Sequence, residues 1–176
     1  MEKEIRNITI VEEKARNIRL EAELTQKQFG EILGISKSYV SDIENGYTGL
    51  SIEQINKICN YAEVTFDYMF DLSKDLNKDI IKIEKINFKI LGSNLKTIRK
   101  ELNITQEKLA SKLNVSRTLV THYENGNRPI STAALKQICE ISAYSADWCV
   151  GKLNKCIKYK QIKKIKPKEI KELIEV

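Results

Sequence analysis

The chain has 176 residues, a hydrophobic fraction of 41% and a formal net charge of +6, which allows two small domains with compact cores and excludes global disorder. Lys, Asp or Asn residues interrupt its apolar clusters before they could span a bilayer, and the N-terminus lacks the apolar run of a signal peptide. Its four cysteines have no partner at metal-ligand spacing, so we expect a cytoplasmic protein with reduced thiols and no metal, cofactor or membrane partner.

Charge is distributed unevenly along the chain. Residues 1–72 carry 8 basic and 13 acidic side chains, whereas residues 90–151 carry 8 and 5 and residues 152–176 carry 9 and 3. Attraction to phosphate groups should therefore be strongest in the second half of the chain.

Five helices with short connections are predicted over residues 1–72, the first domain. Capping boxes begin the second helix at Thr25 and the fourth at Ser51. Gly34 should end the second helix and the pair Asn45-Gly46 the third, because these residues tolerate a positive φ or stop a helix. Apolar spacing predicts the first helix over residues 5–23, with a buried stripe made of Ile5, Ile8, Val11, Ala15, Ile18 and either Leu20 or Ala22.

Residues 73–89 are predicted to link this domain to a second one. The segment contains no Gly or Pro, and Leu76, Ile80, Ile83 and Ile86 fall at loosely helical spacing. This pattern favours a helical, partly packed connector over a charged, solvated strap.

The second domain, residues 90–152, repeats the plan of the first. Ile90, Leu91, Leu95 and Ile98 form the apolar face of its first helix, and Asn114 stands at the turn that Gly34 makes in the first domain. Residues 153–176 form a Lys-rich tail that ends in a short amphipathic helix. The tail could follow a phosphate backbone, remain solvated, or bind a partner or second protomer through Ile170, Leu173 and Ile174.

The two domains are copies of one another. Residues 25–46, TQKQFGEILGISKSYVSDIENG, align without a gap with residues 105–126, TQEKLASKLNVSRTLVTHYENG, at an offset of eighty residues. About fifteen of fifty-six positions are identical between residues 17–72 and 97–152. Each copy has the pattern of a helix, a tight turn and a second helix, the layout that places a helix in the major groove of DNA.

Each copy resembles the DNA-binding domain of the phage-repressor (Cro/cI, XRE-like) family. The resemblance rests on Thr-Gln at the start of a helix, Gly or Asn at the turn, Ile or Val followed by Ser, and a variable helix that ends in Glu-Asn-Gly, all present twice. It implies an all-α protein of two tandem five-helix, lambda-repressor-like helix-turn-helix domains. It also implies a transcriptional regulator, in particular a repressor, that binds double-stranded DNA and is not an enzyme.

Base-reading side chains are expected on the outward face of the third helix of each copy, near its N-terminus. Arg117 is the strongest candidate, because its forked guanidinium matches O6 and N7 of guanine. The predicted base contacts are Lys37, Ser38, Ser41 and Asp42 in the first copy and Arg117, Thr118, Thr121 and His122 in the second.

The resemblance also implies phosphate contacts and two structural ion pairs. Phosphate contacts would come from the first turn of the second helix and from the residues after the third helix, namely Gln26, Asn45, Gln106, Asn125 and Arg128. The two asparagines fit the role of helix stops equally well. Buried ion pairs would brace the first helix against the third, Arg19 with Glu44 and Arg99 with Glu124.

The two sets of predicted readers differ chemically, so the two copies should read different sequences. Asp42 would repel phosphate unless it accepts a hydrogen bond from a cytosine amine, which makes the acidic first copy the weaker DNA binder. An alternative is a protein-interaction module, antitoxin-like or partner-binding, in which the first domain or the tail binds protein or a second copy of the chain. The two linked copies also resemble a dimer built into one chain, suited to sites spaced by about 10 bp, and the DNA-bound protein would be nucleoid-associated.

Overall fold

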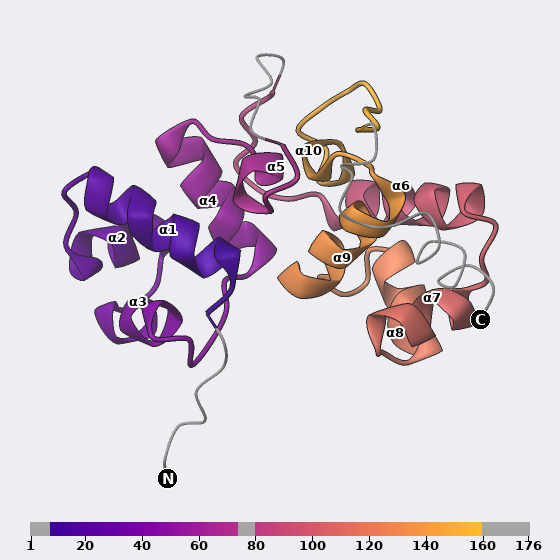
Figure 1. The fold of residues 1–176 in the computed structure, drawn as a ribbon, viewed down its shortest axis with the longest axis horizontal. Helices are drawn as coiled ribbons and strands as arrows, with labels where there is room; N and C mark the ends of the chain where they lie inside the picture. The colour runs from indigo at the N-terminus through magenta and orange to yellow at the C-terminus, as the bar shows by residue number, and fades with distance from the viewer. Residues whose placement is uncertain (1–7, 74–79, 160–176) are drawn as a thin grey trace, which may run out of the picture.

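The computed structural model describes residues 8–73 and 80–159, and residues 1–7, 74–79 and 160–176 lie outside this description. Over the described residues the chain forms ten helices and no strand, with one isolated antiparallel bridge between Tyr144 and Lys158. The helices form two halves of five, which meet in the middle of the molecule (Figure 1). The predicted all-α fold of two tandem domains is confirmed.

The second half repeats the first helix by helix. The first half contains α1 (Ile10–Glu21), α2 (Gln26–Leu33), α3 (Lys37–Glu44), α4 (Ile52–Ala62) and α5 (Phe66–Met69). The second contains α6 (Phe88–Glu101), α7 (Gln106–Leu113), α8 (Arg117–Glu124), α9 (Thr132–Ser142) and α10 (Ala146–Cys149). From α2 and α7 onward, equivalent helices begin and end eighty residues apart, so the offset of the sequence repeat is also the offset of the structure.

Local capping chemistry sets the ends of these helices, as predicted. Thr25 and Ser51 form complete capping boxes at the starts of α2 and α4, which satisfies amide groups that would otherwise lack acceptors. At the end of α2, Gly34 has φ 71°, and its counterpart Asn114 has φ 52°. Both residues therefore occupy the left-handed region that the tight turn requires.

The first helix is shorter than predicted. It begins after Thr9, which is extended (φ −88°, ψ 165°) and forms a capping box with Glu12, so the helix cannot continue toward the N-terminus. Ile8 and Leu20 are 49% and 52% exposed and the alternative Ala22 is exposed as well, so their predicted place in the buried stripe is wrong. Ile5 lies outside the described residues. The buried members of the stripe are Val11, Ala15 and Ile18.

The connector between the halves is packed but not helical, so the predicted helix is wrong over the described residues 80–87. The side-chain amides of Asn56 and Asn60 on α4 donate hydrogen bonds to the carbonyl oxygen of Ile83 at 2.9 and 2.7 Å. Ile86 is buried. The contacts with α4 engage a backbone carbonyl of the connector, and α6 then begins within the predicted linker.

The second half extends beyond residue 152. Leu153 is buried, and the backbone of Tyr159 donates to the carbonyl oxygen of Ala143 at 2.8 Å, which holds this part of the predicted tail against the end of α9. The predicted amphipathic helix, with Ile170, Leu173 and Ile174, lies outside the described residues, as does Leu76.

The buried apolar residues of the two halves belong to one core cluster. In the second half Ile90 is an exception to the predicted face of the first helix, because it is 46% exposed. Fully or nearly fully buried core residues include Phe29, Leu33, Val40, Ile55 and Phe66 in the first half and Leu91, Leu95, Ile98, Val120 and Leu135 in the second.

Candidate nucleic-acid interface

The candidate interface is formed by α2 and α3 in the first half and by α7 and α8 in the second. The N-caps of α3 and α8 are Ser36 and Ser116, whose hydroxyls accept from the backbone N–H groups of Tyr39 and Leu119 at 3.1 and 3.2 Å. Figure 1 shows α3 and α8 along the same edge of the molecule, one in each half. Two recognition-type helices are thus presented on one side of one chain.

All eight predicted base readers are accessible on these two helices. The opposite faces of α3 and α8 are buried, with Val40 and Val120 in the core. Side chains at the N-terminal ends are exposed and those one turn later are partly exposed, so each could approach a base edge. The exposed residues are Lys37, Ser38, Arg117 and Thr118, and the partly exposed ones are Ser41, Asp42, Thr121 and His122.

Arg117 is held at the surface by a weak contact. Its Nε lies 2.9 Å from Oε1 of Glu107 on α7, and the two side chains are 66% and 57% exposed. Ion pairs this exposed contribute little to stability. The guanidinium can therefore leave Glu107 for a stronger bidentate acceptor at small cost.

The two predicted phosphate-contacting glutamines bind the scaffold in this structure. Nε2 of Gln26 donates to Oε2 of Glu44 at 2.9 Å, and Nε2 of Gln106 donates to Oε2 of Glu124 at the same distance. In the second half, Oε1 of Gln106 also accepts from the hydroxyl of Thr121 at 3.2 Å. Each glutamine thus connects the first turn of α2 or α7 to the recognition helix, a role that sequence reasoning did not anticipate.

Both expected ion pairs are present; the first is buried, and in the second Glu124 is buried while Arg99 is partly exposed. In the first half Arg19 donates to both carboxylate oxygens of Glu44, at 2.6 and 3.0 Å, and to the carbonyl oxygen of Leu24 at 2.7 Å. Burial acts to raise the pKa of Glu44, but the hydrogen bonds from Arg19 and Gln26 outweigh it and the pKa is lowered. The carboxylate therefore stays charged beside the guanidinium that it holds.

The second half repeats this arrangement. Arg99 donates to the two oxygens of Glu124 at 2.5 and 3.1 Å and to the carbonyl oxygen of Ile104 at 3.0 Å. The hydrogen bond to Glu124 raises the pKa of Arg99. Because Arg99 lies on α6 and Glu124 ends α8, the pair joins the last turn of the recognition helix to α6.

A close backbone approach fixes α8 further. A Cβ atom on Gly92 of α6 would lie 2.4 Å from the carbonyl oxygen of Tyr123 and 2.7 Å from that of Glu124. Only glycine permits this contact, because the neighbouring atoms are backbone. The last turn of α8 is therefore pressed directly against α6.

The remaining predicted phosphate contacts lie just after α3 and α8. Nδ2 of Asn45 donates back to the carbonyl oxygen of Ser41 at 2.9 Å, which suits a helix stop. Asn125 and Arg128 are exposed, and the position equivalent to Arg128 is Thr48. Only the second half thus presents a cation immediately after the recognition helix.

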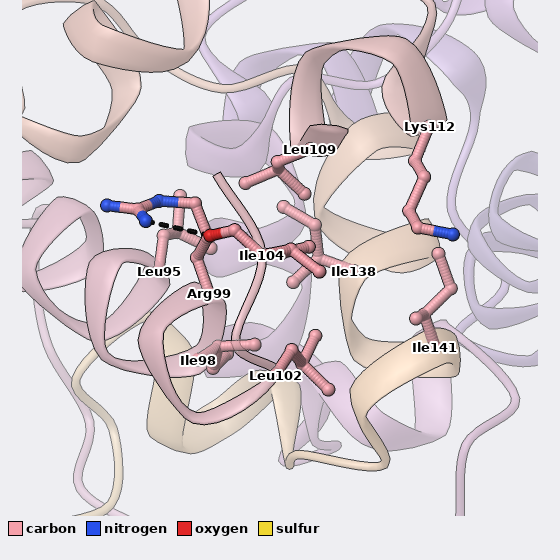
Figure 2. A pocket seen from close by; sticks show the side chains of 9 residues that line it. All are labelled: Leu95, Ile98, Arg99, Leu102, Ile104, Leu109, Lys112, Ile138 and Ile141. Atoms are coloured by element: carbon pink, nitrogen blue, oxygen red, sulfur yellow. Dashed lines mark hydrogen bonds between the residues drawn. The ribbon is translucent and has the colours of Figure 1, made fainter. Parts of the chain in front are cut away.

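No metal centre is found among the described residues. They contain no group of three or more His, Cys, Asp or Glu side chains that could hold a metal ion. A pocket of about 10 Å³ in the second half (Figure 2) has room for roughly one water molecule, and Arg99 on its wall is bound to Ile104. The pocket belongs to the apolar core, lined by Leu95, Ile98, Leu102, Leu109, Ile138 and Ile141 together with Lys112.

Comparisons with known proteins agree with this geometry. A family model described as helix-turn-helix matches residues 16–69 and again residues 95–149, which together make up more than half of the chain. No curated protein and no solved structure matched. Within the described parts of the chain, no helix is long and apolar enough to cross a membrane.

Proposed function

Because this chain belongs to the helix-turn-helix family of the phage-repressor type, we propose that it is a sequence-specific repressor that reads the major groove of double-stranded DNA. Family membership makes the chain a DNA-binding helix-turn-helix regulator. The repressor role, the groove and the reading residues are our proposal. Repression would follow from occlusion, because a protein bound across a promoter excludes the polymerase.

The accessible guanidinium of Arg117 at the start of α8 is the observation that carries this proposal. It lies where a recognition helix contacts base edges, and its guanidinium pairs with the exposed Glu107. A bidentate contact with guanine would contribute about 1–3 kcal/mol of discrimination. Thr118 and Thr121, on the same side of α8, could offer a hydroxyl or a methyl group to neighbouring bases.

Phosphate contacts would set the register of α8 on the duplex. Arg128 lies four residues after the end of α8, and the N-terminus of a helix such as α7 favours anions. Residues 90–151 carry an excess of three positive charges, whereas residues 1–72 carry an excess of five negative charges. We therefore assign most of the DNA affinity to the second half, and a weaker contact to α3 with its Lys37 and Asp42.

The proposal can be tested with the full-length chain and the promoter region of its own gene. Binding should fall steeply between two salt concentrations, because phosphate contacts release counterions. Arg117→Ala should weaken binding to the promoter by about 5- to 150-fold, equivalent to 1–3 kcal/mol, and weaken binding to random DNA of the same length much less. Lys136→Ala removes the same charge from α9 and serves as the matched control.

Two outcomes would contradict this function. If the intact protein bound no DNA above background, the repressor assignment would fail. If it bound DNA but neither salt nor Arg117→Ala altered the affinity, α8 would not be the reader. The first result would favour a protein-interaction module, and the acidic first half would then be the place to search for its partner.

A further inference from the structure

Two equivalent carboxylates cap each other's helices across the contact between the halves. Asp147 accepts hydrogen bonds from the backbone N–H groups of Phe66 and Asp67, both at 3.0 Å. In return Asp67 accepts from the backbone N–H of Ala146 at 2.6 Å and from the hydroxyl of Ser145 at 2.5 Å. Both aspartates are buried, at 2% exposure or less. Neither carboxylate could be satisfied in this way without the other half.

The exchange of contacts is reciprocal, and this defines a symmetry. Asp67 and Asp147 are separated by the repeat offset of eighty residues, as are Phe66 and Ala146. A contact in which residue i touches j while the equivalent of j touches the equivalent of i is the signature of a two-fold interface, whereas a head-to-tail contact joins different surfaces. The two halves are therefore related by a local two-fold axis that passes between the two aspartates. In Figure 1, α5 and α10 meet at the centre, with α3 and α8 on one edge.

A second contact between the halves has no symmetry-related counterpart. Lys152 is 1% exposed, and its ammonium donates to the side-chain oxygens of Asn56 and Asn60 on α4, at 3.1 and 2.8 Å. Two copies of the first half could not form this contact, because the counterpart of Lys152 is Leu72, which has no donor. In two copies of the second half, Lys136 and Glu140 would replace the two asparagines. Glu140 could accept from the ammonium of Lys152, but Lys136 has no acceptor to offer and would repel it.

The connector holds the same two halves together. The backbone N–H of Ile81 donates to the carbonyl oxygen of Lys152 at 2.9 Å, close in sequence to the Ile83 carbonyl that α4 binds. The hydroxyl of Thr132 at the start of α9 donates to the carbonyl oxygen of Leu50 at 2.5 Å, and the hydroxyl of Tyr159 donates to Asp67 at 2.6 Å. The contact is thus secured beside the aspartates by Tyr159, and away from the axis by the connector and Thr132.

We propose that this contact, which we call the clamp (Asp67, Asp147 and Lys152), makes one chain a complete two-reader unit for one bipartite DNA site. The site would consist of two different half-sites, inverted relative to each other and separated by one fixed spacing. Inversion follows from the two-fold axis, since a two-fold protein matches the local dyad of DNA. The difference between half-sites follows from the different side chains on α3 and α8. The proposal rests on the proposed DNA-binding function, and the clamp residues act by positioning the readers without touching DNA.

Selection from a random double-stranded DNA library tests the arrangement. The intact wild-type chain should enrich sites with two different motifs at one spacing. A second chain carries the readers of α8 on α3, through the substitutions Lys37→Arg, Ser38→Thr, Ser41→Thr and Asp42→His. With both readers alike, a two-fold arrangement selects an inverted repeat of one motif, and a head-to-tail arrangement selects a direct repeat.

The outcomes separate this proposal from the function on which it rests. A direct repeat, a single motif, or two motifs at variable spacing would overturn the clamp proposal while leaving DNA binding intact. No enrichment by the wild-type chain would overturn both. Only an inverted repeat at one spacing from the reader-matched chain, together with an unlike pair from the wild type, agrees with the structure.

The role of the clamp residues is tested by varying the spacing of the selected site. Insertion of about five base pairs turns one half-site by half a helical turn, and should cost the wild type about a hundredfold or more in affinity, the usual loss when two linked contacts cannot form together. Asp147→Asn and Asp67→Asn should bind the original site more weakly and discriminate less between spacings. Asp71→Asn makes the same charge change at an exposed position near the end of α5 and should behave as the wild type.

A positioning role and a purely structural one give different results here. A variant that is merely less stable would lose affinity equally at every spacing once circular dichroism shows how much of it is folded. Should the aspartate variants not fold, Lys152→Met provides the same comparison, because it keeps most of the unbranched side chain and removes the donor to α4. Unchanged spacing discrimination in the folded clamp variants would refute the positioning role.

Discussion

Loss of the charge on Glu124 should destabilise the protein strongly, although this residue is not expected to touch DNA. Its side chain is 2% exposed, and it binds an Arg99 side chain that is 13% exposed. The carboxylate accepts two hydrogen bonds from Arg99 and one from Gln106. Glu124→Gln keeps the shape of the side chain but leaves the guanidinium buried without a counter-charge.

The size of the effect follows from this geometry. Removing one partner of a buried ion pair costs about 3–5 kcal/mol. Glutamine retains one oxygen that can still accept from the guanidinium, so we expect the lower end, about 3 kcal/mol. If the chain unfolds in one step, the melting temperature should fall by about 6–12 °C, at roughly 2–4 °C per kcal/mol for a chain of this size.

Thermal and urea unfolding, followed by circular dichroism, measure this difference directly. The matched control is Glu63→Gln, because Glu63 forms an ion pair with Lys82 in which the side chains are 75% and 63% exposed. Solvent screens such a pair, so its removal should leave the unfolding midpoint unchanged within error. Equal midpoints for the two variants would refute the conclusion that the buried pair braces α8 against α6.

Two further predictions concern titratable groups. Burial, and next the facing carboxylate of Asp67, raise the pKa of Asp147 to about 7, with Tyr159, Lys152 and the thiols of Cys59 and Cys139 as the other titratable groups around it. The folded chain therefore holds a proton that the unfolded chain releases near pH 4. This contribution to stability is complete below about pH 4 and is lost as the pH rises through about 7. In a plot of unfolding midpoint against pH, Asp147→Asn should therefore flatten the slope between about pH 4 and 7. An unaltered slope would contradict the prediction. Among the four free cysteines, only Cys156 is exposed, and a thiol reagent should label it first under native conditions, as mass spectrometry would show; equally fast labelling of Cys139 or Cys149 would contradict the buried geometry.

Features that depend on neighbours in sequence could be predicted from the sequence alone. The caps at Thr25 and Ser51 and the left-handed turn at Asn114 involve residues within a few positions of each other, and all three form as expected. The two ion pairs came from the family resemblance, because nothing local in the sequence places Arg19 next to Glu44, which is 25 residues away.

Features that depend on distant residues were missed. The connector has apolar residues at helical spacing, yet α4 binds its backbone through Asn56 and Asn60, and no local pattern announces that contact. Gln26 and Gln106 were expected to donate to phosphate, because the family resemblance and their place beside the free N–H groups of a first helical turn both favour that role. Their bonds to Glu44 and Glu124 appear only once α3 and α8 are in place.

The two aspartates at the centre of the molecule were hidden for the same reason. Their identity at the repeat offset was visible, but an acidic residue in the first turn of a helix is already explained by the helix dipole. The signal that could have been used was the apolar sequence around Asp67, where Phe66, Met69 and Phe70 are fully buried. A carboxylate in an apolar setting needs donors, and in a chain with two copies the equivalent helix of the other copy can supply them.

The clamp joins two unlike halves, and this is related to the different side chains on the recognition helices α3 and α8. In a homodimer of identical chains both recognition helices are identical, so both half-sites are constrained together. In this chain Lys152 meets Asn56 and Asn60 only when the first half pairs with the second, and like halves lack that contact. Pairing of unlike halves permits α3 to carry Lys37 and Asp42 while α8 carries Arg117 and His122. The clamp pairs the first half with the second and not with another copy of itself. This pairing is what allows one chain to carry two different recognition helices and to bind two different half-sites at once.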